Sequence, residues 1–166
     1  MDLVLLQVFA YGIATVKAFA DSLGIKTVGI SSLEALSLIS KPNKVICPLI
    51  DARNNNVYNE IFEFTPEKSN IKRNASFDNI NAFLEELKSL KLEYTITFIG
   101  DGAVAHKEKI LEYLPKSDFI ENNDLSAKNV GLYAYAYSQI ETFPTVEPLY
   151  LRKSEAEKYL EEKNKK

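Results

Sequence analysis

Apolar residues recur at helical spacing near the start of the chain. The intervals of four, three, four and three are those of one face of an α-helix, and the residues are Phe9, Ile13, Val16, Ala20 and Leu23. Gly24 follows directly, and glycine commonly ends a helix because it adopts the left-handed conformation easily. The pattern predicts a helix over residues 9–23.

The next elements are shorter. Residues 26–30 contain β-branched side chains and predict a strand. Ser31 and Glu34 have the spacing of a capping box, in which the serine side chain accepts from the backbone amide three residues on. A helix is therefore expected over residues 32–39.

Two apolar segments predict a pair of strands. Residues 44–50 are almost continuously apolar, as in a strand buried on both faces, and residues 57–64 are rich in aromatic and β-branched side chains. The polar residues 51–56 between them are typical of a turn. An antiparallel pair is expected.

The second half alternates helices and strands. Helices are expected over residues 80–90 and 103–113 and after Ser126, where the apolar pattern extends to Ile140. Strands are expected over residues 94–99 and 118–121. The order of elements predicts an α/β fold with a mixed sheet.

Composition narrows the class of protein. Hydrophobic residues make up 46% of the 166 positions, which is enough for a packed core. The net charge of −3 gives no electrostatic reason to bind RNA directly. Cys47 is the single cysteine and lies in an apolar run, where a buried hydrophobic role is expected. Without a membrane-length apolar stretch or a basic leader, a cytoplasmic location is expected.

One polar segment lies between a predicted strand and a predicted helix. It consists of Gly100, Asp101 and Gly102, and glycines at such a junction allow an anion to approach the backbone. A tight turn capped by Asp101 is the more frequent explanation. These residues are weak candidates for a binding site.

The other polar candidates have equally plain explanations. Asp51 and Arg53 follow an apolar strand, where α/β sheets often place functional groups, and an Asx-turn explains them as well as binding does. His106 is the one histidine, so it has no second histidine to complete a metal site, and an exposed position without function is favoured. We predict no catalytic residue, no metal ligand and no intrinsic cofactor.

The first helix is apolar on nearly all sides. Residues 9–20 have Thr15 and Lys17 as their polar positions, and a helix of this kind must be covered on more than one side. The small residues Gly12 and Ala18 would let a second helix approach closely. A subunit interface is favoured slightly over enclosure within the chain's own domain.

Six segments, taken together, carry a family resemblance. They read GIATVK, GISSLEAL, IDAR, VY, GDGA and PLYLR, at residues 12–17, 29–36, 50–53, 57–58, 100–103 and 148–152. In this order they resemble the bacterial TsaB (YeaZ) proteins, and they cover nearly the whole chain. The combined match is more specific than any single motif.

The resemblance implies an actin-like, sugar-kinase-like (ribonuclease H-like) fold with a mixed sheet and flanking helices. It implies a non-catalytic scaffold that dimerises with the catalytic subunit TsaD and works with the small ATPase TsaE, while TsaD transfers threonylcarbamoyl to adenosine in tRNA. It further implies a homodimer when the chain is alone, only indirect contact with tRNA, and ATP or ADP only within the complex.

The helices over residues 9–23 and 32–39 correspond to those that the family uses for pairing. The interface is expected to include Gly12, Ile13, Val16, Lys17, Ala20, Leu33 and Leu36.

The chain departs from the family at its start. Family members have an N-terminal β-hairpin region and a Gly-Pro-Gly-Ser-Phe-Thr-Gly loop before the first helix, where this chain has residues 2–11. We expect an incomplete first subdomain at residues 1–40, a C-terminal subdomain at 41–151 and a charged tail at 152–166. The alternative function is an enzyme, either a peptidase or an ATP-dependent phosphotransferase.

Overall fold

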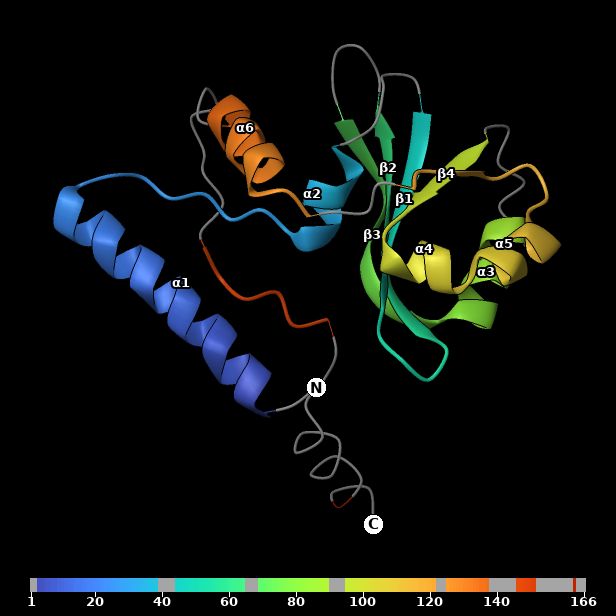
Figure 1. Cartoon of the computed structure of the whole chain (residues 1–166), viewed down its shortest axis with the longest axis horizontal. Helices are drawn as coiled ribbons and strands as arrows, with labels where there is room; N and C mark the ends of the chain where they lie inside the picture. Colours follow the sequence, from blue (N-terminus) through green and yellow to red (C-terminus); the bar gives the residue numbers. More distant parts are fainter. Residues whose placement is uncertain are drawn as a thin grey trace. The chain divides into compact units, whose positions relative to one another are not determined.

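The chain folds into two compact units (Figure 1). The structure is a computed structural model and describes residues 3–38, 44–64, 69–89, 95–121, 125–137, 146–151 and 163. Unit 1 combines Met1–Ile39 with Asp124–Leu149, and unit 2 combines Ser40–Asn123 with Tyr150–Lys166. This grouping does not test the subdomain boundaries expected at residues 40 and 151.

Unit 2 contains a five-stranded mixed sheet in the order β3-β2-β1-β4-β5. β1 (Lys44–Asp51), β2 (Asn56–Phe64) and β3 (Ser69–Asn79) form an antiparallel meander. β4 (Ile96–Ile99) runs parallel to β1, and β5 (Asp118–Phe119) runs parallel to β4. The predicted α/β class with a mixed sheet and flanking helices is confirmed.

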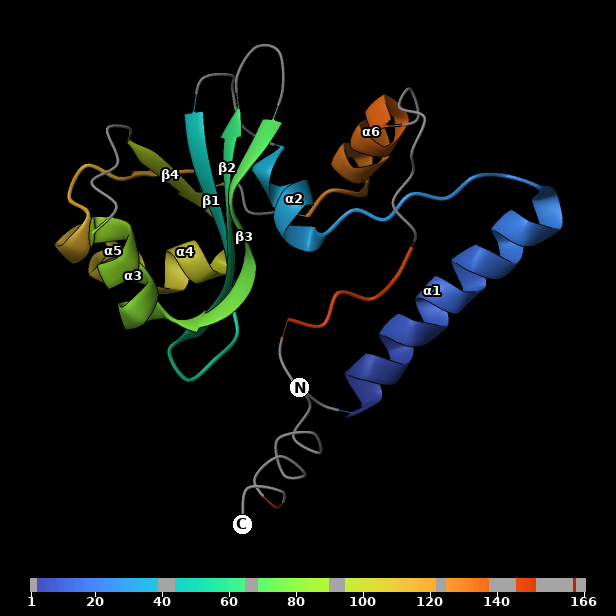
Figure 2. The ribbon, with the colours of Figure 1, turned by 180° about the vertical axis from the view of Figure 1, so that it is seen from behind.

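Three helices cover one face of this sheet (Figures 1 and 2). They are α3 (Ile80–Ser89), α4 (Asp101–Ala105) and α5 (Lys107–Tyr113). Side chains alternate along a strand, so every second residue of β1 points to this face. The core there includes Val45, Cys47, Leu49, Ile80, Phe83, Leu84, Leu87, Ile96, Phe98 and Ile110. Cys47 is buried in it, as the sequence predicts.

The described residues of unit 1 form the helices α1 (Leu3–Leu23), α2 (Ser32–Ser37) and α6 (Ala127–Tyr137). α1 ends at Gly24, whose φ is +63°. Before α2, the Ser31 hydroxyl accepts a hydrogen bond from the Glu34 amide at 3.0 Å. The predicted end of the first helix and the predicted cap of the second are confirmed.

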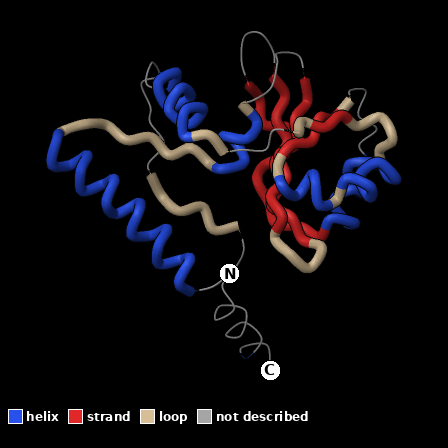
Figure 3. The backbone as a smooth tube through the Cα atoms, viewed as in Figure 1, coloured by secondary structure: helices blue, strands red, loops and turns tan. Residues whose placement is uncertain are grey.

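Three predictions of secondary structure are wrong. Residues 25–31 form a loop rather than a strand (Figure 3), because β-branched side chains favour extended backbone but a strand also needs a neighbour to pair with. β3 is a strand that the hydrophobic pattern does not predict. The helix expected over residues 103–113 is interrupted at His106, which separates α4 from α5.

Some predicted element ends fall at Ile39, Leu90, Tyr94 and Ile140, which lie outside the described residues. The tail at 152–166 also lies outside them, except for residue 163.

Candidate functional site

The two polar turns predicted from the sequence meet at one edge of the sheet. β1 and β4 pair in parallel, in register from Val45↔Ile96 to Pro48↔Ile99, so their carboxyl ends lie side by side. Asp101 Oδ1 accepts a hydrogen bond from the Asp51 amide at 3.0 Å. Residues 50 positions apart are thereby joined.

Both carboxylates hold backbone amides. Asp101 Oδ1 also accepts from the Gly102 amide at 2.8 Å, and Asp51 Oδ1 accepts from the Arg53 amide at 3.1 Å. The second contact is the Asx-turn considered from the sequence. The bonds formed by these two aspartates fix the chain where β1 and β4 end.

Gly102 allows the two strand ends to approach each other. A Cβ at this position would lie 3.0 Å from both C and O of Leu49 and 3.1 Å from the Asp51 amide nitrogen. Backbone atoms cannot move aside as a flexible side chain can. The φ angle of Gly102 is not positive, whereas that of Gly100 is +108°. Gly102 is therefore required by close packing, and Gly100 by conformation.

The turn after β1 has an unusual backbone. Arg53, Asn54 and Asn55 have φ angles of +62°, +53° and +58°, a region that costs roughly 1–2 kcal/mol per residue for most L-amino acids and less for asparagine. The turn is held by bonds from the Asn56 amide to the Arg53 carbonyl at 3.0 Å and from the Ile80 amide to the Asn55 carbonyl at 2.8 Å. These bonds offset the conformational strain.

His106 occupies a position that the sequence does not predict. The expectation of an exposed side chain is wrong, because the side chain is only 13% exposed. Its Nε2 atom is buried without a hydrogen-bond partner and lies 3.9 Å from Asp51 Oδ1. The histidine is directed toward the same strand end that Asp101 holds.

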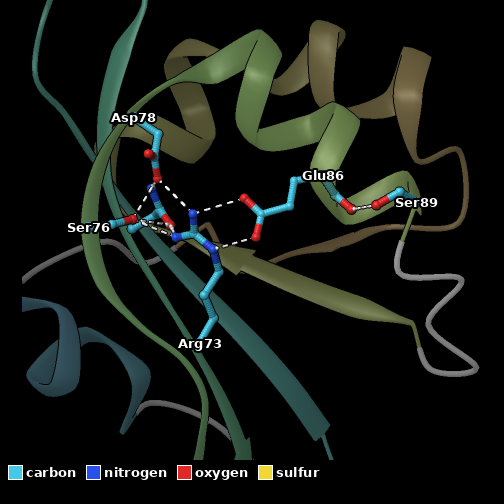
Figure 4. A network of polar contacts seen from close by, with 6 residues as sticks. Arg73, Ser76, Asp78, Glu86 and Ser89 are labelled. Carbon is cyan, nitrogen blue, oxygen red and sulfur yellow. Dashed lines mark hydrogen bonds and ion pairs between the residues drawn. The ribbon is translucent and has the colours of Figure 1, made fainter.

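A second polar cluster joins β3 to α3 and was missed from the sequence (Figure 4). Arg73 donates from Nε and Nη2 to the two carboxylate oxygens of Glu86 at 3.1 and 3.0 Å. Nη2 also contacts Asp78 Oδ2 at 3.0 Å, while Nη1 donates to Asn59 and Ser76. The guanidinium is therefore fully engaged within the protein.

The electrostatics of this cluster follow from its contacts. Burial raises the pKa of Asp78, but hydrogen bonds from Asn59, Ser76 and Arg73 and the Arg73 charge outweigh burial, so the pKa lies below its ordinary value. Burial lowers the pKa of Arg73, and its bonds to Glu86 and Asp78 reverse that effect and raise it. Each charge stabilises the other.

Across the described residues, no group of three or more His, Cys, Asp or Glu side chains is arranged to hold a metal ion. Burial in the apolar core raises the pKa of the Cys47 thiol far above its ordinary value. None of the helices in the described ranges has the length and apolar character that crossing a membrane requires.

Among the α1 side chains that the structure describes, most of the large apolar ones are exposed. Phe19 is 63% exposed and Val16 is 49% exposed, and Phe9 and Leu23 are also exposed. The predicted interface residues differ in burial: Gly12, Val16 and Lys17 are exposed, Ile13 is half-buried, and Ala20, Leu33 and Leu36 are buried. Their role in an interface stays a prediction.

Comparison with known proteins supplies a family and a fold. The family described as "TsaD: tRNA N6-adenosine threonylcarbamoyltransferase" matches residues 9–159. A comparison with curated protein sequences gave no significant match.

Two solved structures share the fold. One is described as an uncharacterized protein with similarity to peptidase YEAZ from Pseudomonas aeruginosa, and the other as YeaZ from Pseudomonas aeruginosa. Each aligns with a TM-score of 0.60 and 16% sequence identity, over 85% and 84% of this chain respectively. The chain spans 66% of the length of each, and at this identity the likeness establishes the fold alone.

Proposed function

The chain belongs to the TsaD family, described as tRNA N6-adenosine threonylcarbamoyltransferase, because the match spans residues 9–159, and we propose that it is a non-catalytic subunit in the formation of threonylcarbamoyladenosine in tRNA. In this role it pairs with the catalytic subunit TsaD and keeps that subunit competent for transfer.

The observation that carries the proposal is the exposed apolar side of α1. Phe9, Val16 and Leu23 lie on one stripe of the helix, and each leaves about half or more of its surface exposed. Apolar surface removed from water contributes about 25 cal/mol per Å², so an apolar helix favours a partner helix that covers it. Gly12 is exposed beside this stripe with open space around its Cα, which suits close approach of a second helix.

The polar site supports an accessory role. The carboxylates of Asp51 and Asp101 accept from backbone amides at the ends of β1 and β4. Carboxylates that accept from backbone amides in this way fix the backbone conformation at the ends of the two strands. A general acid or base must instead reach a proton on the substrate.

The remaining features of the proposed complex follow from this assignment. TsaE completes the assembly, and ATP or ADP binds only when the complex forms. The net charge of −3 suits a subunit that meets tRNA only through its partner, because direct binding of phosphates requires a basic surface. Alone, the chain pairs with a second copy through the same helix.

The experiment is reconstitution with purified TsaD and TsaE. Sedimentation should show a complex of the full chain with TsaD, and threonylcarbamoyl transfer to tRNA should depend on the chain being present. Full transfer activity from TsaD and TsaE without the chain would contradict the proposal.

A second measurement separates the enzymatic alternatives. The isolated chain is incubated with ATP and with peptide substrates, and no turnover is expected. Hydrolysis of either substrate that disappears on Asp51→Ala would identify an enzyme instead.

A further inference from the structure

The one histidine of the chain lies at the corner between α4 and α5. It serves both as the C-terminal cap of α4, with its amide directed to the Gly102 carbonyl at 3.1 Å, and as the residue before α5. Its backbone is thus fixed to the turn that follows β4. The side chain extends from this corner toward Asp51 at the end of β1.

The contact between these side chains is incomplete. His106 Nε2 lies 3.9 Å from Asp51 Oδ1, which is beyond hydrogen-bond distance but within reach of an ion pair. The Nε2 atom is buried and has no hydrogen-bond partner in the described protein. A buried polar atom without a partner is costly, and the nearby carboxylate is the group that would satisfy a proton on Nε2.

We propose that His106 and Asp51 form a pH-sensitive latch that fastens the α4–α5 corner to the end of β1. Protonation makes both ring nitrogens donors and gives the ring a positive charge, so Nε2 can donate to the Asp51 carboxylate. Histidine is the side chain that ordinarily changes charge between pH 5 and 8. The latch closes at acidic pH and opens when the imidazole is neutral.

The charges around His106 agree with this assignment. β1 contributes Asp51, and α4 contributes Asp101, whose Oδ1 is engaged with two backbone amides. β4 has no ionisable side chain in its sequence, ITFI. α5 contributes Lys107, which lies over the Phe119 ring at 5.2 Å, and exposed Glu108, along with Lys109 and Glu112. The ion-pair contact described for His106 is with Asp51 alone.

The latch has a structural consequence at the candidate site. Asp51 Oδ1 also accepts from the Arg53 amide, so closing the latch adds a second donor to the carboxylate that begins the left-handed turn. Acidification thereby tightens the edge where β1 and β4 end. This device goes beyond the proposed function and does not depend on it.

The test is the urea unfolding midpoint of the full chain at pH 5.5 and pH 8, for the wild type and His106→Gln. The unfolding midpoint of the wild type should exceed that of His106→Gln by more at pH 5.5 than at pH 8. When both proteins also carry Asp51→Asn, the difference in unfolding midpoint between the protein with His106 and the His106→Gln variant should no longer change with pH. Glu108→Gln, an exposed neighbour on the same helix, should leave the wild-type pattern intact.

A margin that is equal at the two pH values, or smaller at pH 5.5, overturns the proposal. If Asp51→Asn prevents folding, the comparison of the wild type with His106→Gln decides alone. Because the chain has one histidine, its ring protons form one assignable set in the NMR spectrum. Loss of their dipolar contact with residues of β1 on acidification would equally contradict closure of the latch.

Discussion

Single atoms decide how closely the ends of β1 and β4 approach. Gly102 has no side chain, and the space that a Cβ would occupy is taken by the backbone of Leu49 and Asp51. Asp101 then reaches the Asp51 amide at 3.0 Å. The hydrogen bond and the missing Cβ depend on each other, because a larger residue would push the helix start away from the strand.

Gly102→Ala should destabilise the protein by about 1–3 kcal/mol, the usual cost of inserting a carbon into packed surroundings. Urea unfolding of the full chain measures the loss. Gly131→Ala is the matched control, since a Cβ there meets nothing within 4 Å. Alanine within α6 should stabilise by about 0.5–1 kcal/mol. Equal effects at the two glycines would show that close packing at Gly102 is unimportant.

The sequence predicts part of this site. Turn-forming residues locate Asp51 and Asp101 after strands, and parallel pairing of β1 with β4 brings them together. The burial of His106 could not be predicted, because it depends on contacts across the fold: its neighbour Asp51 is far away along the chain. The Gly-Asp-Gly segment does not by itself show which glycine needs a positive φ, and in the structure that residue is Gly100.

At the scale of elements, β3 carries the group that fastens α3 to the sheet. Register shifts flank the Ile61↔Arg73 pair. The pairs Asn59↔Ser76 and Ile61↔Arg73 are two residues apart along β2 but three residues apart along β3, so β3 has one extra residue here. Such bulges re-aim side chains. Arg73 accordingly contacts Glu86 on α3 (Figure 4).

The sequence did not predict β3 because its residues, SNIKRNASFDN, are mostly polar. Strand prediction depends on alternating apolar side chains, and here hydrogen bonds among polar side chains take the place of apolar packing. Residues 26–30 are the reverse case. Their composition favours a strand, yet they form no strand in the structure.

Arg73→Met should destabilise the protein by about 1–3 kcal/mol, because the buried Asn59 and the partly buried Asp78 lose a donor. Chemical unfolding at pH 7 measures the effect. Lys72→Met is the control: Lys72 pairs with Glu63 at 2.8 Å but is 51% exposed, and exposed ion pairs contribute about 0–1 kcal/mol. A larger loss at Lys72 than at Arg73 would contradict the role given to the cluster.

Arg73→Met should also change how the stability of the protein depends on pH in the acidic range. The pKa of Asp78 is lowered in the folded protein from its ordinary value of 3.8. The stabilisation by its ionised form is therefore complete above that value and is lost as the pH falls through the lower, folded one. Wild type and Arg73→Met should accordingly converge in stability below about pH 4.

At the scale of the whole molecule, α1 presents several exposed large apolar side chains that a partner could cover. It has 21 residues, which gives a length of about 30 Å at 1.5 Å per residue. Val16 lies near its middle, on the stripe that contains Phe9 and Leu23. A long apolar stripe of this kind suits helix-to-helix pairing.

Val16→Glu should abolish association with TsaD and leave the chain folded. An unpaired charge buried in an interface costs about 3–5 kcal/mol, which weakens binding by at least ~100-fold. Sedimentation measures association, and circular dichroism checks the fold. Thr15→Glu introduces the same charge a quarter turn away and should weaken binding less. A folded Val16→Glu variant that binds TsaD normally would remove this stripe from the interface.

The discontinuity of unit 1 affects the order in which parts of the protein can fold during translation. Met1–Ile39 leave the ribosome before the strands of unit 2, yet they share a compact unit with Asp124–Leu149. The strands of unit 2 are synthesised between these two segments and can pair before unit 1 has all its parts. During translation α2 therefore remains without α6, which it contacts in unit 1, while the middle of the chain folds. This interval is when chaperones would have most reason to bind the nascent protein.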